Sequence, residues 1–139
     1  MTDSLNILAV IAYVAATMLT IRWMRPAQTQ GKPDLKTLRL VLTVGLFLHG
    51  SALVPVLGAG NSPNLALGTT LSSVAWLIVM LFLVSSLRAP LTSLGILILP
   101  TATIATLVGW LYPGTSHAPA LDSIAAKTHL LIAGLSYGL

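Results

Sequence analysis

Histidines are the side chains of this 139-residue chain best suited to bind a ligand, because the sequence has no cysteine and only three acids. An imidazole can ligate a metal or form hydrogen bonds through both ring nitrogens. His49 stands inside the apolar run LRLVLTVGLFLHGSALVPVL, residues 38–57. Hydrocarbon offers no water to those nitrogens, so His49 should face protein, a cavity or a bound group.

The residues beside His49 are small. At about 100° per residue, Gly45, Ala52 and Val56 lie within about 60° of the His49 direction, which opens this stripe to a neighbouring helix or a flat ligand. Pro55 lacks a backbone donor, and a kink is expected near it. Two hypotheses remain for His49: it bonds a neighbouring backbone or hydroxyl group, or it holds a ligand.

A second histidine, His129, opens the last apolar segment, HLLIAGLSYGL, and Ala133 and Ser136 lie on the same side of that helix. Without acids or cysteines in the apolar runs, the chemistry left is ligation or hydrogen bonding by neutral imidazole. For ligation, a haem (heme) iron is the natural partner. We therefore predict His49 and His129 as haem-binding residues and iron ligands. They need not share one iron, since His49 lies roughly 12 Å below the outer end of its helix. His117 lies in a loop bounded by glycine and proline, where water satisfies it.

The composition determines the class of protein. With 55% hydrophobic residues, 7% charged residues and a mean hydropathy of +0.91, the chain is predicted to be an integral membrane protein, because soluble domains are about 25% charged. We predict an all-α fold, a polytopic transmembrane helix bundle forming a single domain over residues 1–139. The expected spans are 5–21, 38–57, 65–87 and 91–112, with an incomplete fifth at 129–139, as in a truncated reading frame.

Polar residues gather on one stripe of the first span and in the predicted outer halves of the third and fourth spans. Such small hydroxyl residues indicate either close helix packing or a ligand pocket. In the first span the stripe is expected to face the bundle as ordinary interhelical packing. The residues are Asn6, Tyr13, Thr17 and Thr20 in the first span, Gly68, Thr69, Ser72, Ser73 and Trp76 in the third, and Thr103, Thr106 and Trp110 in the fourth.

Basic residues predict the orientation. Five of the seven lysines and arginines lie in the loop 22–39, which the positive-inside rule places in the cytoplasm, with the N-terminus outside. The net charge of +4 is explained in this way, so the expected partner is a lipid bilayer and not nucleic acid. No Gly-rich phosphate loop or carboxylate pair is present, and no enzymatic activity is expected.

Several runs resemble a known family. LHGSAL around His49, LSSVAWLIVMLFLVSSLRAP, LGILILP and THLLIAGLSYGL resemble the N-terminal half of the cytochrome c assembly membrane proteins of the CcsA/ResC/HemX type, particularly the YpjD-like branch. The resemblance implies a larger bundle in the bacterial inner membrane that carries haem across it for attachment to apocytochrome c, together with other assembly proteins. It matches His129 to the histidine of a His-x₆-Ser-Tyr helix and His49 to the second-span histidine. The family's tryptophan-rich external segment would lie beyond Leu139.

Two other functions remain open. The chain could be part of a small-solute transporter or permease, with Pro55 and Pro100 in broken helices. It could also be a non-catalytic membrane scaffold in which both histidines are structural. Absorbance separates these from the haem hypothesis, since a haem protein gains a Soret band on haem addition.

The orientation can be measured with reporter fusions. We expect a cytoplasmic signal for fusions at about residue 30, and external signals at Asn61 and Thr115, because the loop 22–39 carries most of the basic residues. The opposite pattern would place His49 in the inner half of the membrane and contradict the predicted outer site.

Overall fold

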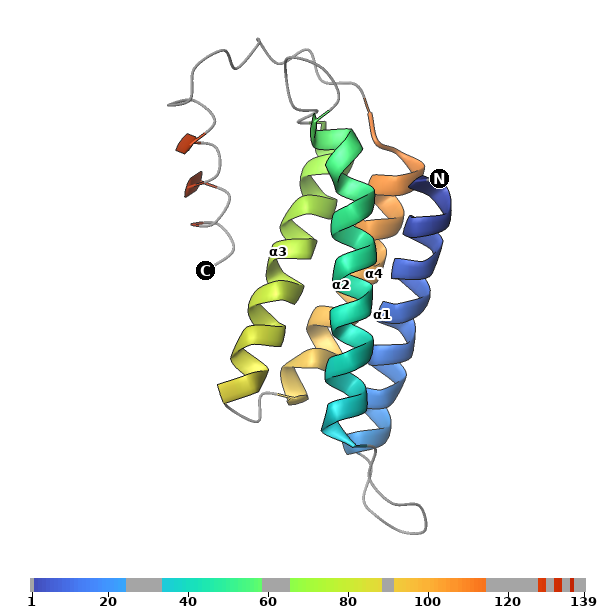
Figure 1. The fold of residues 1–139 in the computed structure, drawn as a ribbon, viewed down its shortest axis with the longest axis vertical. Coiled ribbons are helices and arrows are strands. Elements are labelled where there is room, and N and C mark those ends of the chain that lie inside the picture. Colours follow the sequence, from blue (N-terminus) through green and yellow to red (C-terminus); the bar gives the residue numbers. More distant parts are fainter. Residues whose placement is uncertain are drawn as a thin grey trace.

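A computed structural model of the protein describes residues 2–24, 34–58, 66–88 and 92–114, together with 128, 129, 132, 133 and 136. In this part of the chain every regular element is helical (Figure 1). The elements are α1 (Thr2–Met24), α2 (Leu35–Gly58), α3 (Leu67–Arg88), the short 3₁₀-helix η1 (Thr92–Leu94) and α4 (Gly95–Leu111).

These four long helices have the properties of membrane spans. Each is long and apolar enough to cross a bilayer. Large apolar side chains also cover the outside of the bundle, such as Phe47 at 77% exposure and Leu97 at 73%. Lipid, and not water, is the solvent in which such a surface is stable. The all-α bundle and the multi-pass membrane class are thus confirmed, while the predicted fifth span lies mostly outside the described residues.

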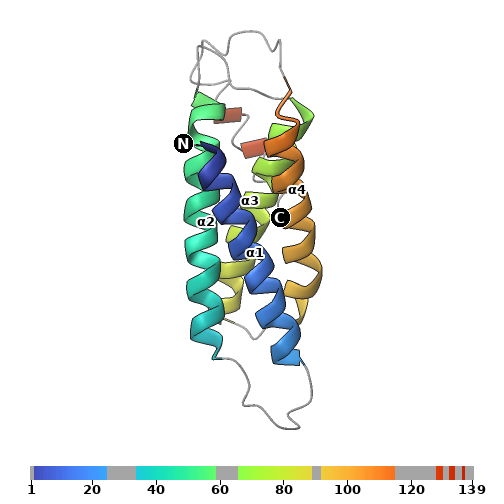
Figure 2. The same cartoon turned by 90° about the vertical axis from the view of Figure 1, so that its right-hand side faces the viewer.

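The helices alternate in direction around a common core. α1 packs along both α2 and α4, and α3 packs along α4, whereas α2 and α3 touch each other least of the consecutive pairs (Figure 2). The core contains Tyr13, Leu42, Val79 and Leu99, one from each helix. The looser α2–α3 seam is where the bundle leaves room for a groove.

Glycines bring α3 and α4 close together. A Cβ on Gly68 would overlap the backbone carbonyl of Tyr112, and one on Gly109 would overlap the side chain of Ser72. Only residues without a side chain allow this approach. The close-packing interpretation of the small residues in the third span is therefore correct for Gly68.

Seven serine and threonine hydroxyls in the described helices are satisfied within their own helix. They donate to the carbonyl four residues earlier, which removes the cost of a free hydroxyl in hydrocarbon. Residues that do so are Thr17, Thr20, Thr43, Ser73, Thr101, Thr103 and Thr106. Ser72 instead bonds the ring of His49 on another helix.

The two ends of the bundle have different chemistry. All the described basic side chains lie at one end: Arg22 in the last turn of α1, Lys36 and Arg39 at the start of α2, and Arg88 at the end of α3. At the opposite end, Trp110 donates a hydrogen bond of 2.9 Å from Nε1 to Oδ1 of Asp3. This bond joins the first turn of α1 to the end of α4.

The two prolines do not break their helices. α2 continues through Pro55 to Gly58, and α4 continues through Pro100 to Leu111. Neighbouring helices and adjacent turns hold the backbone helical where one hydrogen bond is missing. The kink expected near Pro55 is therefore not an interruption of α2.

The α3–α4 contact can be tested with Gly68→Ala. The added methyl group would force the helices apart at the Tyr112 carbonyl, and overpacking of this kind costs about 1–3 kcal/mol. We expect a lower melting temperature in detergent. Leu71→Ala, on the exposed side of the same helix, is the control. An unchanged melting temperature for Gly68→Ala would contradict this packing.

Candidate functional site

His49 lies at the centre of the bundle with its side chain completely enclosed, at 0% exposure. One residue from each of the other three helices meets its ring. Tyr13 Oη is 3.1 Å from Nδ1, Ser72 Oγ is 2.8 Å from Nε2, and Thr106 Oγ1 is 3.5 Å from Nδ1. We call these four residues the His49 cluster.

Both ring nitrogens of His49 are used within the protein. A neutral imidazole carries one N–H donor and one acceptor nitrogen. If Nε2 carries the proton, it donates to Ser72 and Nδ1 accepts from Tyr13; in the other tautomer, Ser72 donates to Nε2 and Nδ1–H faces the oxygens of Tyr13 and Thr106. Either arrangement leaves no ring nitrogen free for a ligand.

Small residues on α2 allow the His49 cluster to close. The rings of Tyr13 and His49 meet edge to face, with centroids 5.7 Å apart and planes at 72°. Gly45 permits this approach, because a Cβ there would lie 2.9 Å from the Cβ of Ala12 and 3.2 Å from the Tyr13 ring. The small-sided stripe predicted beside His49 is confirmed, and a helix, α1, occupies it.

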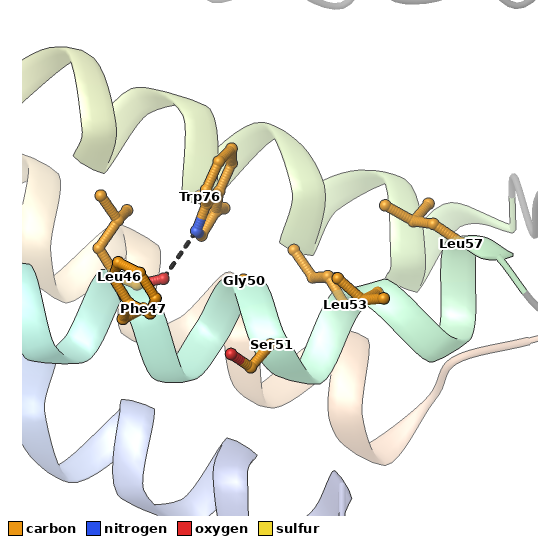
Figure 3. A pocket seen from close by; sticks show the side chains of 8 residues that line it. Leu46, Phe47, Gly50, Ser51, Leu53, Leu57 and Trp76 are labelled. Carbon is orange, nitrogen blue, oxygen red and sulfur yellow. Dashed lines mark hydrogen bonds between the residues drawn. The ribbon is translucent and has the colours of Figure 1, made fainter.

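A groove of about 690 Å³ lies beside the His49 cluster, on the loose α2–α3 seam (Figure 3). Trp76 stands over Gly50, where a Cβ would lie 3.0 Å from the indole Nε1. That nitrogen donates a 2.8 Å hydrogen bond to the carbonyl of Leu46, so the indole has a fixed orientation. The lining is otherwise apolar except for Ser51, and consists of Leu46, Phe47, Gly50, Ser51, Leu53, Val54, Leu57 and Trp76.

The predicted ligand residues are not brought together. His49 is enclosed in the bundle, whereas His129 is exposed and is not among the hydrogen-bond partners of His49. His117 lies outside the described residues. Within the described ranges, no three residues of the types His, Cys, Asp and Glu are grouped as a metal site. The assignment of His49 and His129 as iron ligands therefore stays a prediction.

Sequence reasoning placed the right faces inward but missed the pairing across helices. The sequence predicts ordinary interhelical packing for Tyr13, whereas in the structure Tyr13 is a hydrogen-bond partner of His49. The sequence predicts the depth of Ser72 and Thr106 correctly but does not predict that they contact His49. A buried histidine and a tyrosine on the inner face of the preceding helix together form a signal that such a bond exists.

The fold and this site define a polytopic all-α membrane protein with a polar cluster inside an apolar bundle. Comparisons with models of protein families, with curated proteins and with solved structures gave no match.

The contribution of the His49 cluster can be measured by a double-mutant cycle of Ser72→Ala and His49→Ala. Ser72→Ala removes the partner of Nε2, and a buried polar group without a partner costs about 1–3 kcal/mol. We expect each single variant to unfold more readily in detergent. The double variant should lose less stability than the sum of the two single losses. Ser73→Ala is the control, since Ser73 bonds only its own helix, to Thr69. Additive effects would show that the pair does not interact.

Proposed function

We propose that this protein handles haem in the membrane during cytochrome c assembly. Two considerations support the proposal. One is the resemblance of LHGSAL and THLLIAGLSYGL to the cytochrome c assembly membrane proteins. The other, which carries the proposal, is the α2–α3 groove, whose volume of about 690 Å³ is within the range of about 300–1,000 Å³ typical of pockets for small molecules and cofactors.

The groove suits the porphyrin part of haem. Its walls are aliphatic side chains and the rings of Phe47 and Trp76, and the indole lies directly against Gly50. A planar apolar macrocycle gains contact area and aromatic stacking on such a surface. The groove also lies in the half of the bundle away from the described basic side chains. By the positive-inside rule this is the outer half, where haem is delivered in the family that the sequence resembles.

The iron of haem needs a protein ligand in addition to the surface that holds the porphyrin. His49 does not fit an axial ligand in this packing, because both its nitrogens are bonded and its ring is enclosed. The groove lining contains no histidine, methionine or tyrosine. His129 is exposed and has no hydrogen-bond partner among the described residues. In our proposal His129 supplies the imidazole, while His49 holds the helices that form the groove.

A membrane scaffold without haem is the second candidate. The closed hydrogen bonding of His49 favours it, since a histidine with protein partners on both nitrogens needs no ligand. The permease hypothesis has less support, because α2 and α4 are unbroken at Pro55 and Pro100.

Haem titration in detergent tests the proposal. We expect a Soret shift with the unmodified protein and at least tenfold weaker binding for His129→Ala, as for the loss of metal-site residues. Trp76→Ala should also weaken binding by removing a groove wall. His117→Ala, in a loop, is the control and should bind as the unmodified protein does.

His49→Gln separates the two roles of His49. Glutamine keeps a donor and an acceptor near the Ser72 hydroxyl but does not ligate iron in the way imidazole does. We expect His49→Gln to retain the Soret shift. Its loss in a folded His49→Gln protein would make His49 an iron ligand, and no Soret shift with any variant would favour the scaffold.

A further inference from the structure

A second cavity, of about 220 Å³, lies at the basic end of the bundle, between the start of α2 and the end of α3. Arg39 and Arg88 line it together, and the buried Thr92 of η1 lies on its wall. It is separate from the groove beside Trp76, which lies toward the opposite end of α2.

The two arginines at this cavity have no anionic partner in the described part of the chain. Arg39 donates one bond to the backbone carbonyl of Ser86, near the end of α3, and retains other guanidinium N–H donors. Arg88 has no hydrogen bond or ion pair among the described residues. The described acids are occupied elsewhere: Asp3 at the far end of the bundle, and Asp34 with the backbone N–H of Lys36.

The cavity changes from cationic to apolar with depth. Leu38, Leu42 and Phe82 form its inner wall and are at most 5% exposed. Two cations at the rim and an apolar wall beneath match a molecule with an anionic head and a hydrocarbon tail. A free phosphate ion would use the arginines and leave Leu87, an apolar lining residue at 61% exposure, uncovered.

We propose that this cavity is a binding site for an anionic phospholipid, with the headgroup phosphate between Arg39 and Arg88. Guanidinium groups bind phosphate oxygens through charge-assisted and often bidentate hydrogen bonds. Basic pockets between transmembrane helices take such headgroups. One acyl chain lies against Leu87, a lining residue at 61% exposure, and the lipid joins α2 to α3 at the end of the bundle where Arg39 already bonds Ser86.

Native mass spectrometry of the detergent-purified protein tests this site by titration with phosphatidylglycerol. We expect one tightly held lipid, and Arg88→Gln should weaken its binding roughly fivefold or more, since one cation near a membrane surface contributes about this factor. Lys36→Gln is the control, because it removes the same charge from the same end of the bundle outside the cavity. It should change binding less than twofold.

Three results would overturn the proposal. Equal weakening by Lys36→Gln and Arg88→Gln would show diffuse attraction to the basic end. Binding of phosphatidylcholine as tight as that of phosphatidylglycerol would remove the role of net charge. Displacement of the bound lipid by millimolar inorganic phosphate would assign the cavity to the free ion. Because Arg88 makes no bond in the described structure, Arg88→Gln should fold normally, and an unchanged melting temperature without lipid confirms this.

Discussion

The bundle depends on the hydrogen bonding of one imidazole in a medium that offers no partners. His49 in hydrocarbon needs a partner for each ring nitrogen, and the protein supplies Tyr13 on one side and Ser72 on the other. Thr106 completes the enclosure. Because each partner comes from a different helix, the needs of one side chain fix the mutual positions of all four. Apolar packing against lipid discriminates poorly between helix faces, so polar contacts of this kind define the register.

Close packing and open space are distributed unevenly around this centre. Gly45 lets α1 approach His49, and Gly68 and Gly109 let α4 approach α3. Between α2 and α3 the contact is loose, and the two cavities lie along this seam, one at each end. Trp76 and Arg39 each reach across it to a backbone carbonyl of the other helix. A few polar contacts thus hold the seam together. Because side chains fill it only in part, the two cavities remain open along it.

Much of this could be predicted from the sequence. The lengths of the apolar runs predict the four spans to within a few residues. The cost of an unpaired imidazole in hydrocarbon predicts that His49 lies inside the bundle. Helical periodicity also predicts that Tyr13, Ser72 and Thr106 face inward. It could not say which inward faces meet, because periodicity describes one helix at a time and the pairing depends on the order of helices around the core. The α2–α3 groove was missed for the same reason.

The span of sequence enclosed by the His49 cluster has a consequence for biosynthesis. Tyr13 can meet His49 as soon as the first two helices are in the membrane, but Ser72, the partner of the second ring nitrogen, lies 23 residues beyond His49. At translation rates of about 5–20 residues per second, this interval lasts from roughly 1 to 5 s. During it the hairpin of the first two helices carries an imidazole with one ring nitrogen unpartnered in hydrocarbon, which is costly. The contact between Asp3 and Trp110 then closes the ring of helices last.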